Sequence, residues 1–262
     1  MTDTPAPNVP TPPPYPEPRH LLSGKNVLVT AAAGTGIGFA TATRCVEEGA
    51  AHVAITDIHE RRLSESAAEI GALGIVANVA SEDDVQRCFA QAIDAFGRVD
   101  VLVNNAGLGG TATLVDMTDE QWFSVLDVTL TGTMRMTHAA LRHMTDLGAG
   151  AIVNNASIVG WRAQAGQAHY AAAKAGVMAL TRCAAVEAAS HNVRVNAVAP
   201  SLAMHPHLAK VTTEELLAEL TTREAFGRAA EPWEIANVIV FLASDLASYM
   251  TGEVISVSSQ HP

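Results

Sequence analysis

Three residues whose types and spacing suit proton transfer are Ser157, Tyr170 thirteen residues later and Lys174 four residues after that. Tyr170 and Lys174 are predicted to share one face of a helix, so the Lys174 ammonium would lie close to the Tyr170 phenol. A free phenol, with a pKa of about 10, is too weak a base for neutral pH, and a nearby positive charge favours the phenolate. Such a tyrosine can pass a proton to or from an alcohol or ketone oxygen. Ser157, on a separate loop, could hold that same oxygen. The spacing therefore predicts an enzyme.

A glycine-rich stretch follows the first predicted strand, Asn26–Thr30, and leads directly into a predicted helix that begins at Ile37. Gly34, Gly36 and Gly38 would let the backbone approach a pyrophosphate, and the first helical turn offers free amides with a partial positive charge. A glycine pattern alone is weak evidence, but its place between the first strand and the first helix favours a dinucleotide site.

Asp57 ends the second predicted strand, 19 residues after Gly38, where a carboxylate can accept hydrogen bonds from the adenosine ribose. The same side chain could instead cap the following helix, and the two roles are compatible. Because a carboxylate at this place repels a 2'-phosphate, the sequence favours NAD over NADP. Arg61 and Arg62 follow closely and could reach such a phosphate, which leaves NADP as the alternative.

Short β-rich runs alternate with longer helical patterns from Lys25 onward. Most of the predicted strands are nearly continuous apolar runs, as expected when helices cover both faces of a sheet. The alternation predicts an α/β fold, a single doubly wound Rossmann-type domain with a mainly parallel seven-stranded sheet and helices on both faces. The strands are expected at Asn26–Thr30, His52–Asp57, Gly74–Val79, Val101–Asn104, Ala151–Asn155, Val193–Val198 and Val254–Val257, and the helices at Ile37–Glu48, Arg61–Leu73, Glu82–Phe96, Asp119–Leu147, His169–Ser190 and Pro232–Ala243.

The first 20 residues differ from the rest of the chain. Eight of the 12 prolines lie between Pro5 and Pro18, and such a segment favours an extended polyproline conformation without a packed core. We expect residues 1–20 to form a disordered or surface-draped arm, with a ligand for a proline-binding module as the alternative. Residues 21–262 are expected to form the nucleotide-binding catalytic domain.

The composition argues against several classes of partner. With 16 basic and 27 acidic residues the chain carries a net charge of −11, whereas nucleic acid binding requires a basic face. No apolar run approaches the roughly 18 residues of a membrane helix, and no charged-then-apolar signal segment stands at the start. Cys45, Cys88 and Cys183 lie far apart without metal-ligand spacing, so we expect no metal site and three buried free thiols, as in a reducing cytoplasm.

Together these elements resemble the short-chain dehydrogenase/reductase family over nearly the whole chain after Lys25. The resemblance implies that Tyr170 is the proton donor or acceptor and that Ser157 orients the substrate oxygen. It implies that Lys174 lowers the phenol pKa and bonds the nicotinamide ribose. The motifs that carry it, and that would contact the cofactor, are Gly34, Gly36, Ile37 and Gly38 of the glycine turn, Asp57, Asn78-Val79, Asn104-Asn105-Ala106-Gly107, Tyr170, Lys174, Pro200 and Ala203.

Four departures from the family pattern accompany these matches. The first glycine of the turn is absent, and the turn is one residue longer. Thr129 takes the place of an asparagine that in the family helps position a water linking the lysine to solvent. The Thr129 hydroxyl could do part of this, or could bond to its own helix backbone. Ser201 replaces a glycine in the turn after the sixth strand, and Ser258–Pro262 replace an acidic stretch that ends in glycine.

Several segments resemble, more narrowly, an actinobacterial steroid-degradation branch of the family. That resemblance implies a ring hydroxyl on a hexahydroindane CoA thioester as the substrate. Trp161 could form a wall of an apolar pocket or cap the core. Arg162, Lys210 and Arg223 could meet CoA phosphates, with ordinary surface charge as the alternative. The segments are Val29–Gly38, His59–Leu63, Ala156–Gln164, Glu224–Glu234 and Thr251–Pro262.

The leading prediction is an NAD-dependent alcohol dehydrogenase or ketoreductase acting on a bulky alicyclic, CoA-linked substrate. A fatty-acid-type 3-oxoacyl reductase is the alternative within enzymes, and Asp57 counts against it because such enzymes usually prefer NADPH. A non-catalytic dinucleotide sensor is the alternative of another class. The family resemblance further implies a homotetramer.

Overall fold

One parallel sheet organises the chain in the computed structural model, which describes residues 10–204 and 214–260. Its order is β3-β2-β1-β4-β5-β6-β7, and all six pairings are parallel. This confirms the predicted doubly wound α/β fold. The strands are β1 (Asn26–Val29), β2 (His52–Asp57), β3 (Leu73–Val76), β4 (Val101–Asn104), β5 (Gly150–Asn155), β6 (Val193–Pro200) and β7 (Val254–Val257).

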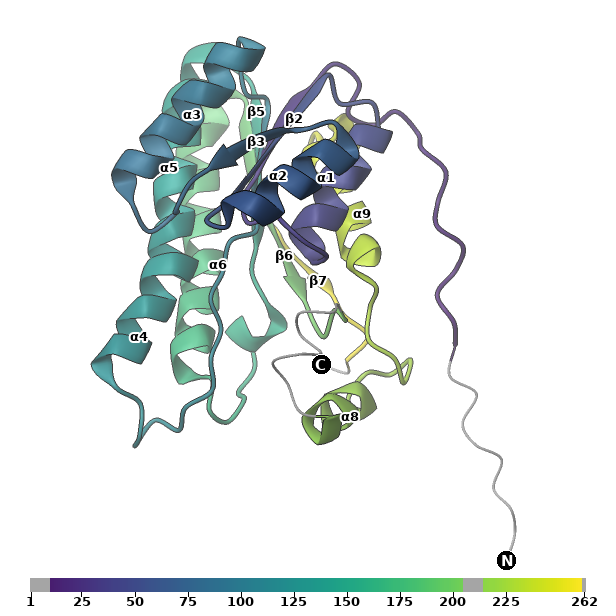
Figure 1. The fold of residues 1–262 in the computed structure, drawn as a ribbon, viewed down its shortest axis with the longest axis vertical. Coiled ribbons are helices and arrows are strands. Elements are labelled where there is room, and N and C mark those ends of the chain that lie inside the picture. Colours follow the sequence, from purple (N-terminus) through teal and green to yellow (C-terminus); the bar gives the residue numbers. More distant parts are fainter. Residues whose placement is uncertain (1–9, 205–213, 261–262) are drawn as a thin grey trace, which may run out of the picture.

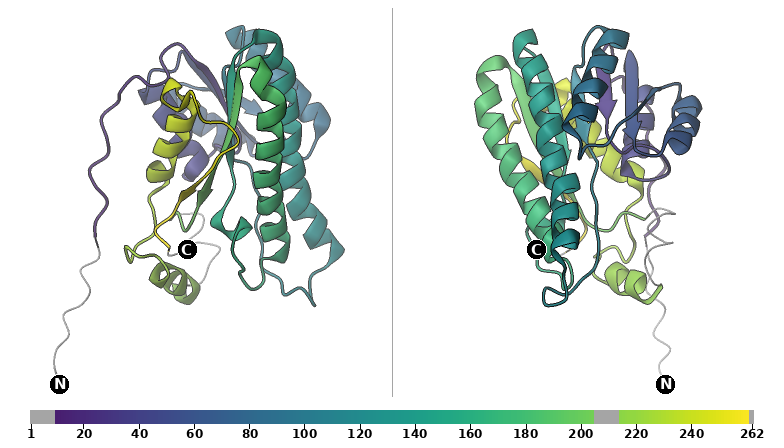
Figure 2. Two further views of the ribbon diagram at one scale, coloured as in Figure 1. Left: turned by 180° about the vertical axis from the view of Figure 1, so that it is seen from behind. Right: turned by 60° about the vertical axis from the view of Figure 1, so that its left-hand side comes forward.

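Helices cover both faces of the sheet (Figures 1 and 2). On one face lie α1, α2 and α9, and on the other lie α3, α5 and α6. The helices are α1 (Ile37–Glu47), α2 (Glu60–Ile70), α3 (Glu82–Phe96), α4 (Asp119–Leu126), α5 (Gly132–Leu147), α6 (Ala168–Ala188), α8 (Glu214–Thr222) and α9 (Pro232–Ala243).

The apolar strands are explained by burial on both faces. In β1, Val27 and Val29 belong to the core beneath α1 and α9, whereas Leu28 belongs to the core beneath α3 and α5. Successive side chains of a strand point to opposite faces of the sheet. When helices cover both faces, nearly every position of the strand is therefore apolar.

The predicted helix Asp119–Leu147 is divided by one π-helical stretch, Asp127–Thr131, between α4 and α5. A capping box, in which Thr118 and Gln121 satisfy each other's backbone amides, begins α4. At the start of α5, a Cβ on Gly132 would lie 2.7 Å from a Val79 methyl carbon, so glycine permits the helix to pass the segment after β3. Such π turns are often found at functional sites, and this one carries Thr129.

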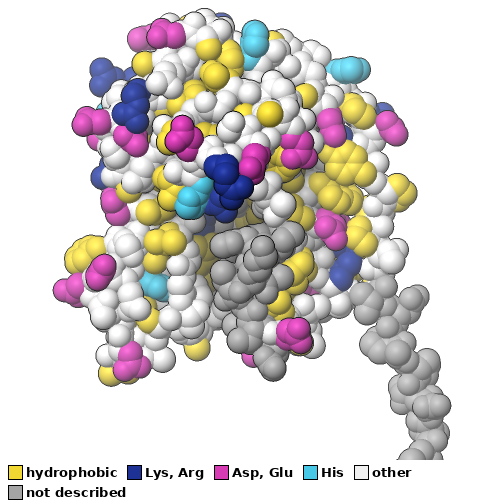
Figure 3. Space-filling view, viewed as in Figure 1, with side chains coloured by type: hydrophobic (Ala, Val, Ile, Leu, Met, Phe, Trp, Pro, Cys, Tyr) yellow, Lys and Arg dark blue, Asp and Glu magenta, His cyan; other side chains and the backbone are white. Residues whose placement is uncertain are grey.

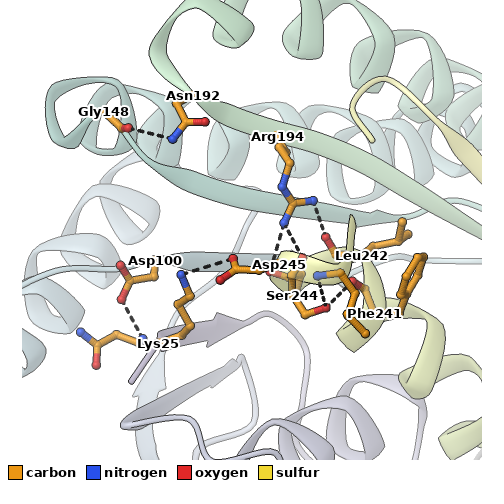
Figure 4. Close-up of polar contacts among 12 residues, drawn as sticks. Lys25, Asp100, Gly148, Asn192, Arg194, Phe241, Leu242, Ser244 and Asp245 are labelled. Atoms are coloured by element: carbon orange, nitrogen blue, oxygen red, sulfur yellow. Dashed lines mark hydrogen bonds and ion pairs between the residues drawn. The ribbon is translucent and has the colours of Figure 1, made fainter. Parts of the chain in front are cut away.

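The end of α9 is held by the neighbouring strand β6 (Figure 4). The Arg194 guanidinium donates to the carbonyl oxygens of Leu242 at 2.7 Å, Ser244 at 3.0 Å and Ala243 at 3.2 Å. These carbonyls have no partner within the helix, and a cation favours the negative end of the helix dipole. Burial lowers the pKa of Arg194 from its ordinary value, yet the side chain gains these three acceptors in return.

Three sequence expectations differ from the structure. The strand expected at Gly74–Val79 is β3 at Leu73–Val76, and the residues after it leave the sheet. The helix α8 was not among the predicted helices. The expectation of three buried thiols is wrong for Cys183, which is exposed because its position on α6 faces away from the sheet. Cys45 and Cys88 are buried, and burial raises the pKa of each to about 12.

Residues 10–20 contact the body of the protein at α1 and α9. The Tyr15 hydroxyl donates to Glu47 at 2.5 Å, and the Tyr15 ring meets Trp233 edge-on at 5.4 Å between ring centroids. Arg44 lies over the other side of Tyr15 and donates to the Pro16 carbonyl at 2.7 Å. The proline-rich segment therefore has specific polar partners from residue 15 onward.

The surface is mixed in charge. On the face drawn in Figure 3, acidic side chains are scattered widely, while Lys and Arg gather in only a few places. Across the described residues, no helix is long and apolar enough to cross a membrane.

Candidate active site

The carboxyl ends of the central strands bring the predicted site residues to one edge of the sheet. Because β1, β4, β5 and β6 run in the same direction, the segments that follow them meet there. The strand order reverses between β1 and β4, which is where doubly wound folds bind ligands.

A cleft of about 670 Å³ opens at this edge, a size suited to a dinucleotide. The end of β2, the residue Arg62 and the segments after β1, β3 and β4 line it. Tyr170, Lys174, Pro200 and Ala203, which were also predicted to contact the cofactor, do not line this cleft. Its walls include ten predicted cofactor residues, namely Gly34, Gly36, Ile37, Gly38, Asp57, Asn78, Val79, Asn105, Ala106 and Gly107.

The first turn of α1 fits a pyrophosphate. Gly36 precedes the helix without any side-chain cap, and the first turn holds no acidic residue, so its positive end faces the cleft uncompensated. Any side chain at Gly38 would collide with the Asn105 side chain and the Ala31 carbonyl, so glycine is required there. The Gly34 amide, by contrast, already donates to the Ser66 hydroxyl at 3.0 Å.

Asp57 lines the same cleft at the end of β2. Its carboxylate accepts the His59 amide at 3.0 Å and lies 4.0 Å from the Arg62 guanidinium. The residue that caps α2 is His59, so the alternative role of Asp57 as the cap residue itself is wrong. A carboxylate and a guanidinium therefore face the cleft together.

Two asparagines connect the glycine turn to the catalytic helix. The Asn105 amide donates to the carbonyls of Thr30 at 3.2 Å and Ala31 at 3.0 Å, and Asn105 accepts from the Asn155 amide at 2.9 Å. The Asn155 carbonyl in turn accepts from the Lys174 ammonium at 2.5 Å. A continuous chain of hydrogen bonds thus runs from the first strand to α6.

Ser157, Tyr170 and Lys174 lie together beside this chain. Ser157 follows β5 and accepts the Val159 amide at 3.2 Å, which fixes the loop. Tyr170 and Lys174 occupy successive turns of α6, and the Lys174 nitrogen lies 5.5 Å from the centroid of the Tyr170 ring. The predicted sharing of one helix face is therefore what the structure shows.

The protonation of these residues is governed mainly by burial. Burial raises the pKa of Tyr170, and hydrogen bonding with Ser157 acts in the opposite direction. Burial also lowers the pKa of Lys174 to about 8. The pKa of Tyr170 is thus raised by burial and not lowered as the spacing predicted, and the Lys174 ammonium donates to the Asn155 carbonyl.

Comparison with known proteins agrees with this geometry. Residues 31–259 match the protein family described as enoyl-(acyl carrier protein) reductase. A short-chain dehydrogenase of Mycobacterium smegmatis, of known structure, is 54% identical and superposes with a TM-score of 0.85 over 95% of this chain and 98% of that chain. The chain belongs to the short-chain dehydrogenase/reductase family. It is therefore an oxidoreductase of that family, with a nicotinamide cofactor.

Two curated members of the family differ in their similarity to the chain. From Mycobacterium tuberculosis, (5R,7aS)-5-hydroxy-7a-methyl-1-oxo-2,3,5,6,7,7a-hexahydro-1H-indene-carboxyl-CoA reductase is 60% identical over 92% of this chain and 95% of that protein. A 3-oxoacyl-(acyl-carrier-protein) reductase of Thermotoga maritima is 40% identical over 90% of this chain and 97% of that protein.

Ala31 stands where the pattern of this short-chain dehydrogenase/reductase family has its first glycine. Its φ is +50°, in the left-handed region that favours glycine. An L side chain there costs roughly 1 kcal/mol, and the bonds from Asn105 to the Ala31 carbonyl hold the backbone in place. The turn therefore places an alanine in a backbone conformation that glycine adopts more readily.

Thr129 forms contacts that neither sequence alternative described. Its buried hydroxyl accepts the Leu108 amide at 2.9 Å and donates to the Leu108 carbonyl at 3.1 Å. A Cβ on Gly107 would lie 3.4 Å from the Lys174 nitrogen and 3.8 Å from the Thr129 hydroxyl, so only glycine separates the two residues. Thr129 thus fixes the loop after β4 rather than bonding to its own helix.

Ser201 has a partner that no motif indicated. Its hydroxyl donates at 3.0 Å to Glu224, a buried carboxylate just after α8. Nearby, Ala203 pairs with Ala230, and the Met204 amide donates to the Ala230 carbonyl at 2.9 Å. The segment after β6 therefore rests on the stretch that precedes α9. The serine at position 201, where the family has a glycine, was the sequence feature that could have indicated this contact. A single glutamate such as Glu224 forms no recognisable motif.

The side of the site away from the cleft combines apolar and polar groups. Trp161 is 51% exposed, which is compatible with both predicted roles, as a wall of an apolar pocket or as an aromatic that caps the core. Of the residues considered for CoA phosphates, Arg162 donates to the Gln260 amide oxygen at 2.8 Å and Arg223 pairs with Glu219. Lys210 lies outside the described residues.

Proposed function

We propose that the chain is an NAD-dependent oxidoreductase that interconverts a secondary alcohol and a ketone on a bulky alicyclic CoA thioester. The observation that carries this proposal is the convergence of Ser157, Tyr170 and Lys174 beside a nucleotide-sized cleft. The 60% identity to a reductase of a hydroxy-hexahydroindane carboxyl-CoA supports the substrate class.

The chemistry follows from the three side chains. When bound, the nicotinamide accepts or supplies a hydride at the carbinol carbon. Tyr170 would transfer the proton between its phenol oxygen and the substrate oxygen, while Ser157 would hold that oxygen by a hydrogen bond. Lys174, with a pKa of about 8, would bond the cofactor ribose and favour the phenolate when charged.

Asp57 supports NAD as the cofactor. Its carboxylate would accept hydrogen bonds from the ribose hydroxyls and repel a 2'-phosphate. Arg62 lies in the same cleft and could attract that phosphate, but its guanidinium is 4.0 Å from Asp57, which partly neutralises it. We therefore expect NAD to be preferred.

A second candidate is a fatty-acid-type 3-oxoacyl reductase, favoured by the 40% identity to the Thermotoga maritima enzyme. The same experiment separates the two. We would measure initial rates with NAD and NADP against alicyclic hydroxyacyl-CoA and linear 3-hydroxyacyl-CoA substrates. Turnover of the alicyclic set with NAD supports the proposal, whereas a preference for linear chains with NADP contradicts both its substrate and its cofactor.

Catalysis itself is tested by Tyr170→Phe, which keeps the ring and removes the oxygen that moves the proton. We expect turnover to vanish while NADH binding is retained. Unchanged turnover would instead favour the non-catalytic sensor. The homotetramer and the cytoplasmic location are further parts of the proposal, and light scattering on the purified protein tests the first.

A further inference from the structure

Glu224 is a buried carboxylate whose hydrogen-bond donors, among the residues that the structure describes, are all neutral groups. It is 4% exposed. One oxygen accepts the Leu202 amide at 3.3 Å and the Gln260 side-chain amide at 2.9 Å, and the other accepts the hydroxyls of Ser201 at 3.0 Å and Ser259 at 2.8 Å. Four donors fill the acceptor sites of the carboxylate, so its burial is compensated without a cation.

These donors belong to separate parts of the chain. Ser201 and Leu202 follow β6, whereas Ser259 and Gln260 belong to the C-terminal tail. Gln260 also accepts from Arg162, five residues after Ser157, at 2.8 Å. One carboxylate thereby connects the segment that carries Ser157, the segment after β6 and the tail.

The location of α8 shows which part of the chain this connection holds in place. In Figures 1 and 2, α8 lies beyond the ends of β6 and β7, apart from the helices that cover the sheet. Ser201 and Leu202 lie just after β6, and Glu224 lies just after the end of α8. Glu224 therefore connects the chain just behind α8 to the segment that follows β6, through its bonds to Ser201 and Leu202.

Two departures from the family pattern meet at this point. Ser201 stands in place of a glycine, and Ser259 and Gln260 stand in a tail that differs from the family's. All three side chains donate to Glu224. Their hydrogen-bonding groups are thus explained by a single carboxylate.

We propose that Glu224 is a positioning residue that places α8 and the Trp161–Arg162 loop around the substrate, and so sets the affinity for substrate and not for cofactor. The proposal rests on the proposed function, since it assumes an acyl-CoA substrate on this side of the site. The nucleotide cleft shares no residue with the Glu224 network, and Pro200 and Ala203, which flank Ser201 and Leu202, do not line it, which is why cofactor binding should be insensitive to the network.

The partners of Glu224 allow a sharp choice of variants. Glutamine can replace the carboxylate, because its oxygen can face the Leu202 and Gln260 amides while its NH₂ donates to the two serine hydroxyls, which can also accept. Leucine leaves all four donors unpaired. The matched control is Glu219→Leu on α8, since Glu219 is exposed and its carboxylate pairs with Arg223 on the protein surface.

The test compares kcat, KM for the acyl-CoA substrate and the Kd for NADH. We expect Glu224→Leu to raise KM about tenfold or more with the Kd for NADH unchanged. Glu224→Gln should rescue most of this loss, and Glu219→Leu should resemble the wild type. A folded Glu224→Leu variant with the wild-type KM would overturn the proposal, as would an equal loss of NADH affinity and KM.

Two further measurements keep the test independent of folding and of the substrate. If Glu224→Leu does not fold, Gln260→Ala removes the link to Arg162 near the chain end and should raise KM alone. If the wild type turns over no acyl-CoA, the proposed function fails, but amide hydrogen exchange still decides the positioning role. Faster exchange in residues 158–164 and in α8 in Glu224→Leu, and not in Glu219→Leu, is expected; equal exchange in both variants would refute it.

Discussion

Replacing Lys174 with methionine should make the folded protein more stable at neutral pH while abolishing turnover. Lys174 is 3% exposed, and burial lowers its pKa from 10.5 to about 8. Below pH 8 the folded protein therefore keeps a charge that burial disfavours. Methionine fills a similar volume without that charge, and it also loses the hydrogen bond to the Asn155 carbonyl.

The folded and unfolded pKa values of Lys174 give the size and the sign of the change in the free energy of unfolding. Between pH 8 and 10.5 the unfolded chain binds more protons at Lys174 than the folded protein does, so the stability of the wild type rises with pH. Integrating between these values gives a gain of about 1 kcal/mol from pH 7 to pH 9. The whole shift corresponds to about 3 kcal/mol, and losing the hydrogen bond offsets about 1 kcal/mol, which leaves the variant about 2 kcal/mol more stable at pH 7.

Urea unfolding at pH 7, 8 and 9 measures this effect, because groups common to both proteins cancel in the difference. The advantage of Lys174→Met should shrink by about 1 kcal/mol over this range. Lys25→Met is the control, since Lys25 is partly exposed and pairs with Asp245. If the free energies of unfolding of the wild type and of Lys174→Met changed with pH by the same amount, the conclusion that burial disfavours the charge of Lys174 would be refuted.

Three other changes test separate parts of the structure. Asp57→Ser should raise kcat/KM with NADP relative to NAD by about tenfold or more, because Arg62 then faces the cleft alone; steady-state kinetics with both cofactors would show it. Thr129→Val removes both bonds to Leu108 and should cost about 1–3 kcal/mol in urea unfolding as well as lowering kcat, and normal stability would contradict the role given to its hydroxyl. Arg44→Met leaves the buried Glu48 carboxylate without its cation, so calorimetry should show a loss of about 3–5 kcal/mol, whereas an unchanged Tm would show that the pair contributes nothing.

The sheet was largely predictable, because strands that are buried on both faces consist of nearly continuous runs of apolar residues. The bounds of β2, β4 and β7 agree with the expectation residue for residue. The end of β3 was not predictable, since Ala77 and Val79 are buried like strand residues although they lie beyond the strand. Apolar character reports burial and does not distinguish a strand from the turn that leaves it.

The site was predictable where local spacing decides geometry. The interval from Tyr170 to Lys174 is such a case, because one helix fixes their relation. The partners of Thr129 and Glu224 were not predictable, because Leu108 and Gln260 reach them across the fold from distant parts of the chain. The raised pKa of Tyr170 was also missed, since it depends mainly on the burial of the phenol in the folded protein.

The C-terminal tail has a practical consequence for anyone who handles the protein. Chain ends are the usual places for affinity tags, fluorophores and immobilisation linkers, because they are normally free of contacts. Here Ser259 and Gln260 bond to Glu224, and the Ala225 amide donates to the Ser259 carbonyl at 2.8 Å. A label fused directly behind these residues would compete with those bonds for space, so the proline-rich N-terminal side is the better point of attachment for assays that measure turnover.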